Sequence, residues 1–347
     1  MGDKTNLREN LLVGLGNPLL DISANVEKDF LAKYDMKEND AILASDKHKN
    51  LYKELVENHQ VEYTAGGSVQ NTLRVAQWLL EKPKVTTFLG CVGVDKYSKI
   101  LYDKATSDGV NVQYQYDSEH PTGTCAVLIT DHHRSLCASL GSANCFTVDH
   151  IRKPENKKLL DAAHYYYISG FFLTVSPDTI MEVAKLALAH DKPFAMNLSA
   201  PFICEFFSEP LMQVIPYVDV IFGNETEAET FASRQNWNTK DLKEIALKIC
   251  KLSKQNENRS RIAIITQGVH PVILAKDGKI TEFEVHEIPT EKIVDTNGAG
   301  DAFVGGFLSQ YIQGKDLDIC VKCATWAASR IIQRSGCTFE GKANFQA

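Results

Sequence analysis

Short apolar runs alternate with longer amphipathic segments along most of this chain. The apolar runs have the length of buried strands and lie at 11–15, 85–89, 165–171, 194–198, 218–222 and 262–266. Segments with helical periodicity lie between or after them, at 70–81, 178–190, 240–252 and 299–313. This alternation is typical of βαβ units, and it predicts an α/β fold with a central, mostly parallel sheet flanked by helices.

Two stretches interrupt the alternation. Residues 22–43 lack it, and within 110–140 a set of side chains alternates with other residues at period two, namely Tyr114, Tyr116, Cys125, Val127 and Ile129. A period of two indicates strands with one buried face, so we predict that these stretches build a smaller sheet. Because no repeat, low-complexity segment or Pro-rich linker marks a boundary, we predict one domain over 1–347.

Composition excludes several classes of protein. With 347 residues and 44% hydrophobic residues, the chain can bury a large core. A charged fraction of 23% and a net charge of −7 give no polyanion-binding signature, so we expect neither nucleic acid nor a membrane as partner. Nine scattered cysteines in so long a chain indicate a reducing compartment, and the sequence indicates neither secretion nor membrane spanning. We therefore expect a cytoplasmic protein.

The segment with the most functional information is Asp295-Thr296-Asn297-Gly298-Ala299-Gly300-Asp301. Small residues lead into a helix whose first amide groups lie bare at the positive end of the helix dipole, which is an anion site. Asp301 follows directly. A carboxylate in the first turn of a helix is often only a dipole partner, but this arrangement also suits phosphoryl transfer, in which amides hold the phosphate and Asp301 accepts the proton of an attacking hydroxyl.

Other polar residues follow the predicted strands. In parallel sheets, ligands bind at the carboxyl ends of strands, where we place Asn17, Gly90, Gly170, Asn197, Asn224 and Gly268. Asp21 lies just past the first strand, where its carboxylate could accept two hydrogen bonds from the vicinal hydroxyls of a ribose. Gly66 and Gly67 allow a close backbone approach before Ser68, a plausible helix cap, and Asn71 lies one turn beyond Ser68 on the same face.

The 295–301 string resembles the signature of the ribokinase-like (PfkB) carbohydrate kinase family, which has the pattern D-T-x-G-A-G-D. Further segments at 16–21 (GNPLLD), 65–71 (AGGSVQN) and 223–227 (GNETE) are similar to the branch of that family that phosphorylates adenosine. The resemblance spans nearly the whole chain. It implies a ribokinase-like fold with a lid built from roughly 17–45 and 110–142, and a monomer that uses ATP and Mg²⁺ to convert adenosine to AMP in purine salvage.

The resemblance also implies roles for single residues. Asp301 would be the base, and the amides of Gly298, Ala299 and Gly300 would form the anion hole. The nucleoside would contact a set of polar and apolar residues, namely Asn17, Leu19, Asp21, Gly66, Gly67, Ser68, Asn71, Cys125, Leu136, Leu140, Phe171 and Asn297. The apolar members could equally be ordinary core residues. Ala41 departs from the family, which often has Gln at the matching place.

ATP would contact Arg134, Asn224, Thr266, Gly268 and Thr325 by the same resemblance. Thr325 departs from the pattern, because relatives often place a His there. Glu227, in the Asn224-Glu225-Thr226-Glu227 string, would support hydrated Mg²⁺, an ion that keeps several waters and needs few protein ligands.

Alternatives remain for the function. Within the same family, the substrate could be another nucleoside or a free sugar. From a different class, the chain could be a nucleoside-binding regulator without catalysis, although a pure binder has no need of a base at Asp301. A dinucleotide-binding oxidoreductase is remote, because Leu19 stands where the third glycine of the fingerprint belongs.

Cys320 and Cys323 form a C-x-x-C pair without a second pair at zinc spacing, so we expect buried helix cysteines there.

Overall fold

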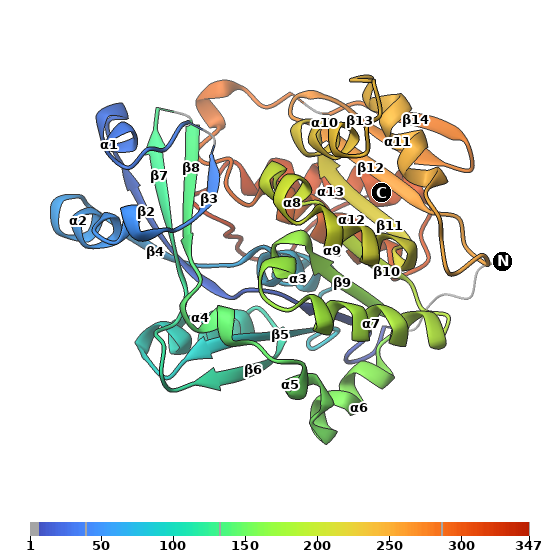
Figure 1. Cartoon of the computed structure of the whole chain (residues 1–347), viewed down its shortest axis with the longest axis horizontal. Coiled ribbons are helices and arrows are strands. Elements are labelled where there is room, and N and C mark those ends of the chain that lie inside the picture. Colours follow the sequence, from blue (N-terminus) through green and yellow to red (C-terminus); the bar gives the residue numbers. More distant parts are fainter. Residues whose placement is uncertain (1–6, 39, 132, 286, 347) are drawn as a thin grey trace.

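A large twisted sheet forms the centre of the molecule (Figure 1). The computed structural model describes residues 7–38, 40–131, 133–285 and 287–346, and the segment 1–6 considered for secretion lies outside them. In spatial order, the described strands of this sheet are β14 (Lys279–Phe283), β13 (His270–Lys276), β12 (Ile262–Gln267), β11 (Val220–Asn224), β10 (Phe194–Asn197), β9 (Tyr165–Ser169), β1 (Leu12–Leu15), β5 (Thr86–Gly93) and β6 (Asn111–Asp117). From β6 to β12 all neighbours pair parallel, and only β13 and β14 are antiparallel additions.

Helices cover both faces of the large sheet (Figure 1). One face packs against α5 (Val148–Arg152), α6 (Pro154–Ala162), α7 (Pro177–Ala189), α8 (Pro201–Phe206), α9 (Ser208–Val214), α10 (Glu225–Arg234) and α11 (Leu242–Lys251). The other packs against α3 (Ser68–Leu80), α4 (Lys96–Ser107), α12 (Ala299–Tyr311) and α13 (Leu317–Ile331). Successive strand residues point to opposite faces, so neighbours such as Tyr166 and Tyr167 enter different cores. The predicted doubly covered α/β sheet is confirmed.

A second sheet stands beside the large one (Figure 1). Its order is β3 (Ala41–Leu43), β8 (His133–Ser139), β7 (Thr124–Thr130), β2 (Leu19–Asn25) and β4 (Glu62–Gly66). One face buries apolar residues against α1 (Lys28–Lys33) and α2 (Leu51–Asn58). Its other face carries Asp21 and Cys125, which are register partners on β2 and β7.

The structure corrects two details of the sequence analysis. Tyr114 and Tyr116 lie on β6, which pairs with β5 in the large sheet and not in the small one. β6 is the last described strand on that edge, with Val112 and Tyr114 in the core on one face and the partly buried Asn111, Gln113 and Gln115 on the other. It therefore has the same period of two as a strand of a half-covered sheet. Gly90 lies inside β5 rather than at its end, because the strand continues to Gly93.

Two observations concern helices. Cys320 and Cys323 are buried, unpaired cysteines of α13, as predicted. Among the described residues, no helix combines the length and apolar character that crossing a bilayer requires.

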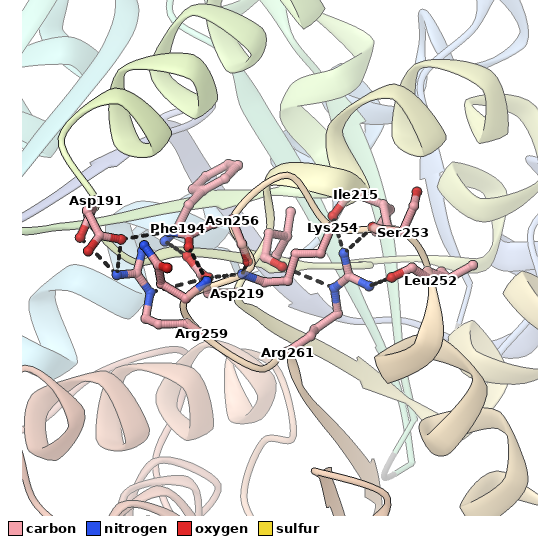
Figure 2. A network of polar contacts seen from close by, with 12 residues as sticks. Asp191, Phe194, Ile215, Asp219, Leu252, Ser253, Lys254, Asn256, Arg259 and Arg261 are labelled. Carbon is pink, nitrogen blue, oxygen red and sulfur yellow. Dashed lines mark hydrogen bonds and ion pairs between the residues drawn. The ribbon is translucent and has the colours of Figure 1, made fainter.

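A buried polar network fixes the amino-terminal ends of the central strands (Figure 2). Asp219, 2% exposed just before β11, accepts from the Phe194 amide at 2.9 Å and from Lys254 Nζ at 2.6 Å. Arg259 Nε adds a longer contact to Asp219 at 3.4 Å. Nearby, the buried Arg261 guanidinium donates only to backbone carbonyls, those of Ile215, Val218, Ile249, Leu252 and Ser253. The network thus ties the ends of α11, β10, β11 and β12 together.

Replacing Asp219 with Ala should destabilise the fold strongly. The change leaves the Lys254 ammonium without its buried partner, and loss of one member of a buried pair costs about 3–5 kcal/mol. Asp161→Ala is the matched control, because it removes a carboxylate from the exposed pair with Lys157, where about 0–1 kcal/mol is expected. Urea unfolding followed by circular dichroism measures both. Equal unfolding free energies for the two variants would contradict the structural role.

Candidate active site

A cavity of about 250 Å³ lies between the small sheet and the carboxyl ends of the large-sheet strands. This is the edge at which open α/β sheets bind ligands. The following residues predicted from the sequence to contact a substrate or take part in catalysis line it: Asn17, Leu19, Asp21, Gly67, Ser68, Asn71, Cys125, Leu136, Leu140, Phe171, Glu227, Asn297, Gly298, Gly300 and Asp301. Segments far apart in the chain therefore meet in one place.

Asp301 is held between two helices. It lies in the first turn of α12, and two residues at the start of α3 donate to its carboxylate: Ser68 Oγ to Oδ1 at 2.7 Å and Asn71 Nδ2 to Oδ2 at 3.2 Å. Arg74 Nη1 donates to Asn71 Oδ1 at 3.1 Å, which fixes the orientation of that amide. Arg74 is itself buried and paired with Asp108 at 2.7 Å. The carboxylate is thus oriented by a rigid outer layer of residues.

The segment before Asp301 has the backbone of an anion site. Gly298 is the N-cap of α12 and has φ +77°, a left-handed conformation that favours glycine. The Ala299 amide donates to the Thr296 carbonyl at 3.2 Å, while the amides of Gly300 and Asp301 belong to the first turn, where a helix supplies no acceptor. A Cβ atom at Gly300 would meet no protein atom within 4 Å. Gly300 therefore lines the cavity, and no protein atom fills the space where its side chain would be.

Asp21 enters the cavity from β2 and is 6% exposed. A Cβ atom at Gly66, on neighbouring β4, would lie 2.2 Å from Asp21 Oδ1, so only glycine leaves room for this carboxylate. Gly67 has φ +93°, and a Cβ there would lie 2.3 Å from the Asn17 carbonyl. Gly66 thus leaves room for the Asp21 carboxylate without itself lining the cavity. Gly67 allows the backbone before α3 to approach the backbone at Asn17 closely.

The cavity has one apolar wall and one unsatisfied acceptor. Leu19, Cys125, Leu136, Leu140 and Phe171 contribute to the wall, together with Ala41. Flat apolar walls with a few polar groups are typical of small-molecule sites. Asn17 Oδ1 is buried without a hydrogen-bond partner among the described residues, and it lines the same cavity. A bound ligand with a donor group can satisfy it.

Glu227 lies at the far side of the cavity, inside a capping box. Asn224 Oδ1 accepts from the Glu227 amide at 2.8 Å, and the Asn224 amide donates back to Glu227 Oε2 at 2.9 Å. Asn224 and Thr266 are register partners at the ends of β11 and β12. Gly268 follows with φ +58° and open space around it. These residues share one edge of the sheet, but Asn224, Thr266 and Gly268 do not line the cavity.

Two other residues predicted for ATP lie apart from the cavity. Arg134 Nε, on β8, pairs with Asp295 Oδ1 at 2.8 Å, and Arg134 Nη2 donates to the Val294 carbonyl at 2.5 Å. Thr325 Oγ1 donates to the Lys322 carbonyl of its own helix at 3.0 Å. Asp295 also accepts from the amides of Asn297 and Gly336, each at 2.8 Å. The first aspartate of the motif is therefore a structural anchor for the loop before α12.

Sequence reasoning missed several lining residues. Ser169, Asn197, Ser199, Thr174, Phe202, Ile42, Leu43 and Ala138 also line the cavity. Asn197 stood out only as a residue at a strand end, and the others carry no signal that separates them from ordinary core or loop residues. The orienting role of Arg74 was also missed, because an arginine in a helix with both apolar and polar residues is usually exposed on the surface.

Burial raises the proton affinity of three carboxyl groups around the cavity. It raises the pKa of Asp21 to about 7, with the nearby Asp301 charge as the second cause. It raises the pKa of Asp301 to about 6, although the hydrogen bonds from Ser68 and Asn71 oppose this. The pKa of Glu227 rises to about 7, again through burial. Raised carboxyl pKa values clustered in a cleft are typical of functional sites.

The ligand-free protein should lose stability as the pH rises from about 4 to about 7. In this window the folded state still binds protons at Asp21, Asp301 and Glu227 that the unfolded chain has released, so the free energy of unfolding falls with pH. A difference of one pKa unit corresponds to about 1.4 kcal/mol. Urea titrations at several pH values measure the slope, and Asp21→Asn should flatten it. A rise in stability over the same window, absent from Asp21→Asn, would contradict the assignment.

Comparison with known proteins agrees with this geometry. The model of the pfkB family of carbohydrate kinases matches residues 28–343. Adenosine kinase 2 from Arabidopsis thaliana is 52% identical over 97% of this chain and 98% of its own length. Adenosine kinase from Saccharomyces cerevisiae is 43% identical over 94% of this chain and 95% of its own.

Solved structures agree as well. The adenosine kinase of Anopheles gambiae, in complex with P1,P4-di(adenosine-5) tetraphosphate, has a TM-score of 0.96 and 56% identity over 98% of this chain and 100% of its own. The Schistosoma mansoni enzyme in complex with adenosine and AMP has a TM-score of 0.92 and 33% identity over 98% and 100%. The chain therefore belongs to the pfkB family of carbohydrate kinases, and within it to the adenosine kinases.

Proposed function

We propose that this chain transfers the terminal phosphoryl group of ATP to the 5′-hydroxyl of adenosine, giving AMP and ADP. Its membership of the family makes it an ATP-dependent phosphotransferase that acts on a hydroxyl group. The choice of adenosine is supported by similarity to adenosine kinases over nearly the whole chain, one of them solved with adenosine and AMP. Kinases for a free sugar or another nucleoside remain the alternative.

One observation carries the catalytic part of the proposal. A half-buried carboxylate, Asp301, stands directly after the Gly300 amide at a helix N-terminus, at the wall of the cavity. In the proposed step, the 5′-oxygen attacks phosphorus, its proton passes to Asp301, and the bond between phosphorus and the ADP oxygen breaks. The amides of the first turn stabilise the charge on the transferring group, which is where phosphoryl transfer gains most from an enzyme.

The nucleoside would lie with its ribose near α3 and its base against the apolar wall. Asp21 can accept from two vicinal hydroxyls, and Asn17 Oδ1 offers a free acceptor nearby. Asn71 and Ser68 supply donors at the start of α3. The apolar wall with Leu136 suits a flat heteroaromatic ring. Ala41 leaves the base without the polar side chain expected at this place.

ATP and Mg²⁺ would enter from the edge where β11 and β12 end. Mg²⁺ prefers oxygen ligands and usually arrives bound to nucleotide phosphates with several waters, so it needs few protein groups. The buried Glu227 carboxylate fits this ion through an intervening water. When bound, the ion would neutralise phosphate charge, and Asn224, Thr266 and Gly268 form the nearby edge of the sheet.

We further propose that the small sheet closes over bound adenosine as a lid. Excluding water prevents transfer of phosphate to water, which is the usual reason for such lids in kinases. Arg134 on β8, which pairs with Asp295 in this structure, could then exchange that partner for phosphate. Amide hydrogen exchange in 124–139 should slow at saturating adenosine, while β13 at 270–276, on the far side of the large sheet, keeps its rate. Unchanged exchange in 124–139 would contradict closure.

A substrate panel tests the function directly. ADP formation from ATP and Mg²⁺ is measured with adenosine, guanosine, inosine, ribose and fructose at equal concentrations. Adenosine should give the highest kcat/KM by at least an order of magnitude. Preference for ribose or another nucleoside would assign the alternative within the family, and tight adenosine binding without ADP formation would identify a regulator that binds but does not catalyse.

A further inference from the structure

A cluster of three metal-ligating side chains lies apart from the cavity, where chain segments pass between the two sheets. Asp117 ends β6, His120 lies in the following connection, and Cys145 ends the 3₁₀ helix η2 (Gly141–Cys145). Asp117 Oδ2 is 2.7 Å from His120 Nδ1, which is 3.4 Å from Cys145 Sγ. Within the described residues, this is the one such group whose ligand atoms all lie within 4.8 Å of one another.

We propose that Asp117, His120 and Cys145 form a binding site for a zinc-like divalent transition metal. A carboxylate, an imidazole and a thiolate are the ligands that Zn²⁺ accepts, whereas Mg²⁺ requires oxygen. Ligand atoms on a tetrahedral zinc ion lie roughly 3.3–3.8 Å apart, given bonds of about 2.0–2.3 Å. Metal binding therefore needs the carboxylate and imidazole that now share a hydrogen bond to separate by roughly 0.6–1.1 Å, while all three ligand atoms already lie within 4.8 Å of one another.

The ligands are already positioned by the backbone. Asp117 accepts from the amides of Glu119 and His120, both at 3.2 Å, so the turn that presents the imidazole is formed without metal. The His120 side chain is 53% exposed and that of Asp117 16%, which leaves solvent access for the ion and for a water as fourth ligand. Cys145 is one of two partly exposed cysteines in the described chain, and the other, Cys250, lies on α11.

The site joins two connections between the sheets. One runs from β6 to β7 through His120, and the other leaves β8 and ends at Cys145. They already touch, since the Ser142 amide donates to the Pro121 carbonyl at 2.8 Å, and a Cβ at Gly123 would lie 2.4 Å from the Leu140 carbonyl. Leu140 also lines the cavity. A bound ion would cross-link both connections and so restrict movement of the small sheet.

Metal binding to the full, tag-free chain without nucleotide tests the site. Titration with Co²⁺ should give one ion per chain and a thiolate-to-cobalt charge-transfer band in the near ultraviolet. Zn²⁺ should displace Co²⁺ and raise the melting temperature. Cys145→Ser and His120→Gln should each weaken binding at least tenfold and remove the band or reduce it sharply. Cys250→Ser and the exposed His270→Gln are the matched controls, and both should bind like the wild type.

Thiol labelling of the wild-type chain gives an independent readout. Zn²⁺ should slow alkylation of Cys145 in mass-mapped peptides and leave Cys250 unchanged. Equal labelling of Cys145 with and without equimolar Zn²⁺ would overturn the proposal. So would Co²⁺ binding of unaltered affinity in folded Cys145→Ser and His120→Gln, or no binding at micromolar protein and metal.

Discussion

Turnover of adenosine should fall by about 10²–10⁴-fold when Asp301 is replaced by Asn, because that is the usual contribution of a general base. The substitution keeps the size of the side chain and can still accept from Ser68. It removes the group that takes the proton of the 5′-hydroxyl. Affinity for adenosine should change much less, since the loss falls on the transition state. Single-turnover kinetics and calorimetry measure the two quantities separately.

Gly300→Val is the contrast to this variant. A Cβ atom at Gly300 would meet no protein atom within 4 Å, so the fold should tolerate a side chain there, but that side chain would occupy the space in front of the first-turn amides. This variant should lose phosphoryl transfer with its carboxylate intact. If Asp301→Asn transfers phosphate at nearly the wild-type rate, the carboxylate is only a partner of the helix dipole, and the proposed mechanism is wrong.

Asp21→Ala should weaken adenosine binding by about 2–4 kcal/mol, because a charge-assisted acceptor for two hydroxyl groups is lost. Burial raises the pKa of Asp21 to about 7, so the effect should be largest above pH 8, where the carboxylate is charged. Calorimetry at pH 6 and pH 8.5, conditions set about one to two units on either side of that value, separates charge from shape.

Cys125→Ala is the matched control for Asp21→Ala. Cys125 is the register partner of Asp21 and lines the same cavity, but it offers the ribose no charged acceptor. It should weaken adenosine binding only slightly, and ATP binding should barely change in either variant. Equal adenosine affinity of Asp21→Ala and the wild type at pH 8.5 would remove the ribose role of Asp21.

The large sheet could be predicted from the sequence because its strands are buried on both faces. The run 11–15 (LLVGL), for example, contains no polar residue, and the helices between the strands are long enough to show their period. The sequence predicts the wrong sheet for the edge strand β6, because its buried apolar face and its polar face alternate as in a half-covered sheet. The short strand β4 and its pairing with β2 carry no signal of their own.

The candidate site was predictable as a set of residues but not as a set of contacts. Gly298 in the motif, and Gly66 and Gly67 before Ser68, mark backbone positions where only glycine fits. The hydrogen bond from Ser68 to Asp301 joins positions 233 residues apart, and no local pattern indicates it. The orienting role of Arg74 is likewise visible only once α3, β4 and the C-terminal segment are packed together.

The two hydrogen bonds that Asp301 receives from α3 make its strength as a base depend on whether the substrate is bound. In the ligand-free protein, Ser68 and Asn71 stabilise the charged carboxylate and so make it a weaker base. A ribose that recruits these same donors takes them away from Asp301 at the moment its own hydroxyl arrives. Substrate binding would then strengthen the base it is about to use, whereas in an empty cavity the two hydrogen bonds keep Asp301 a weaker base.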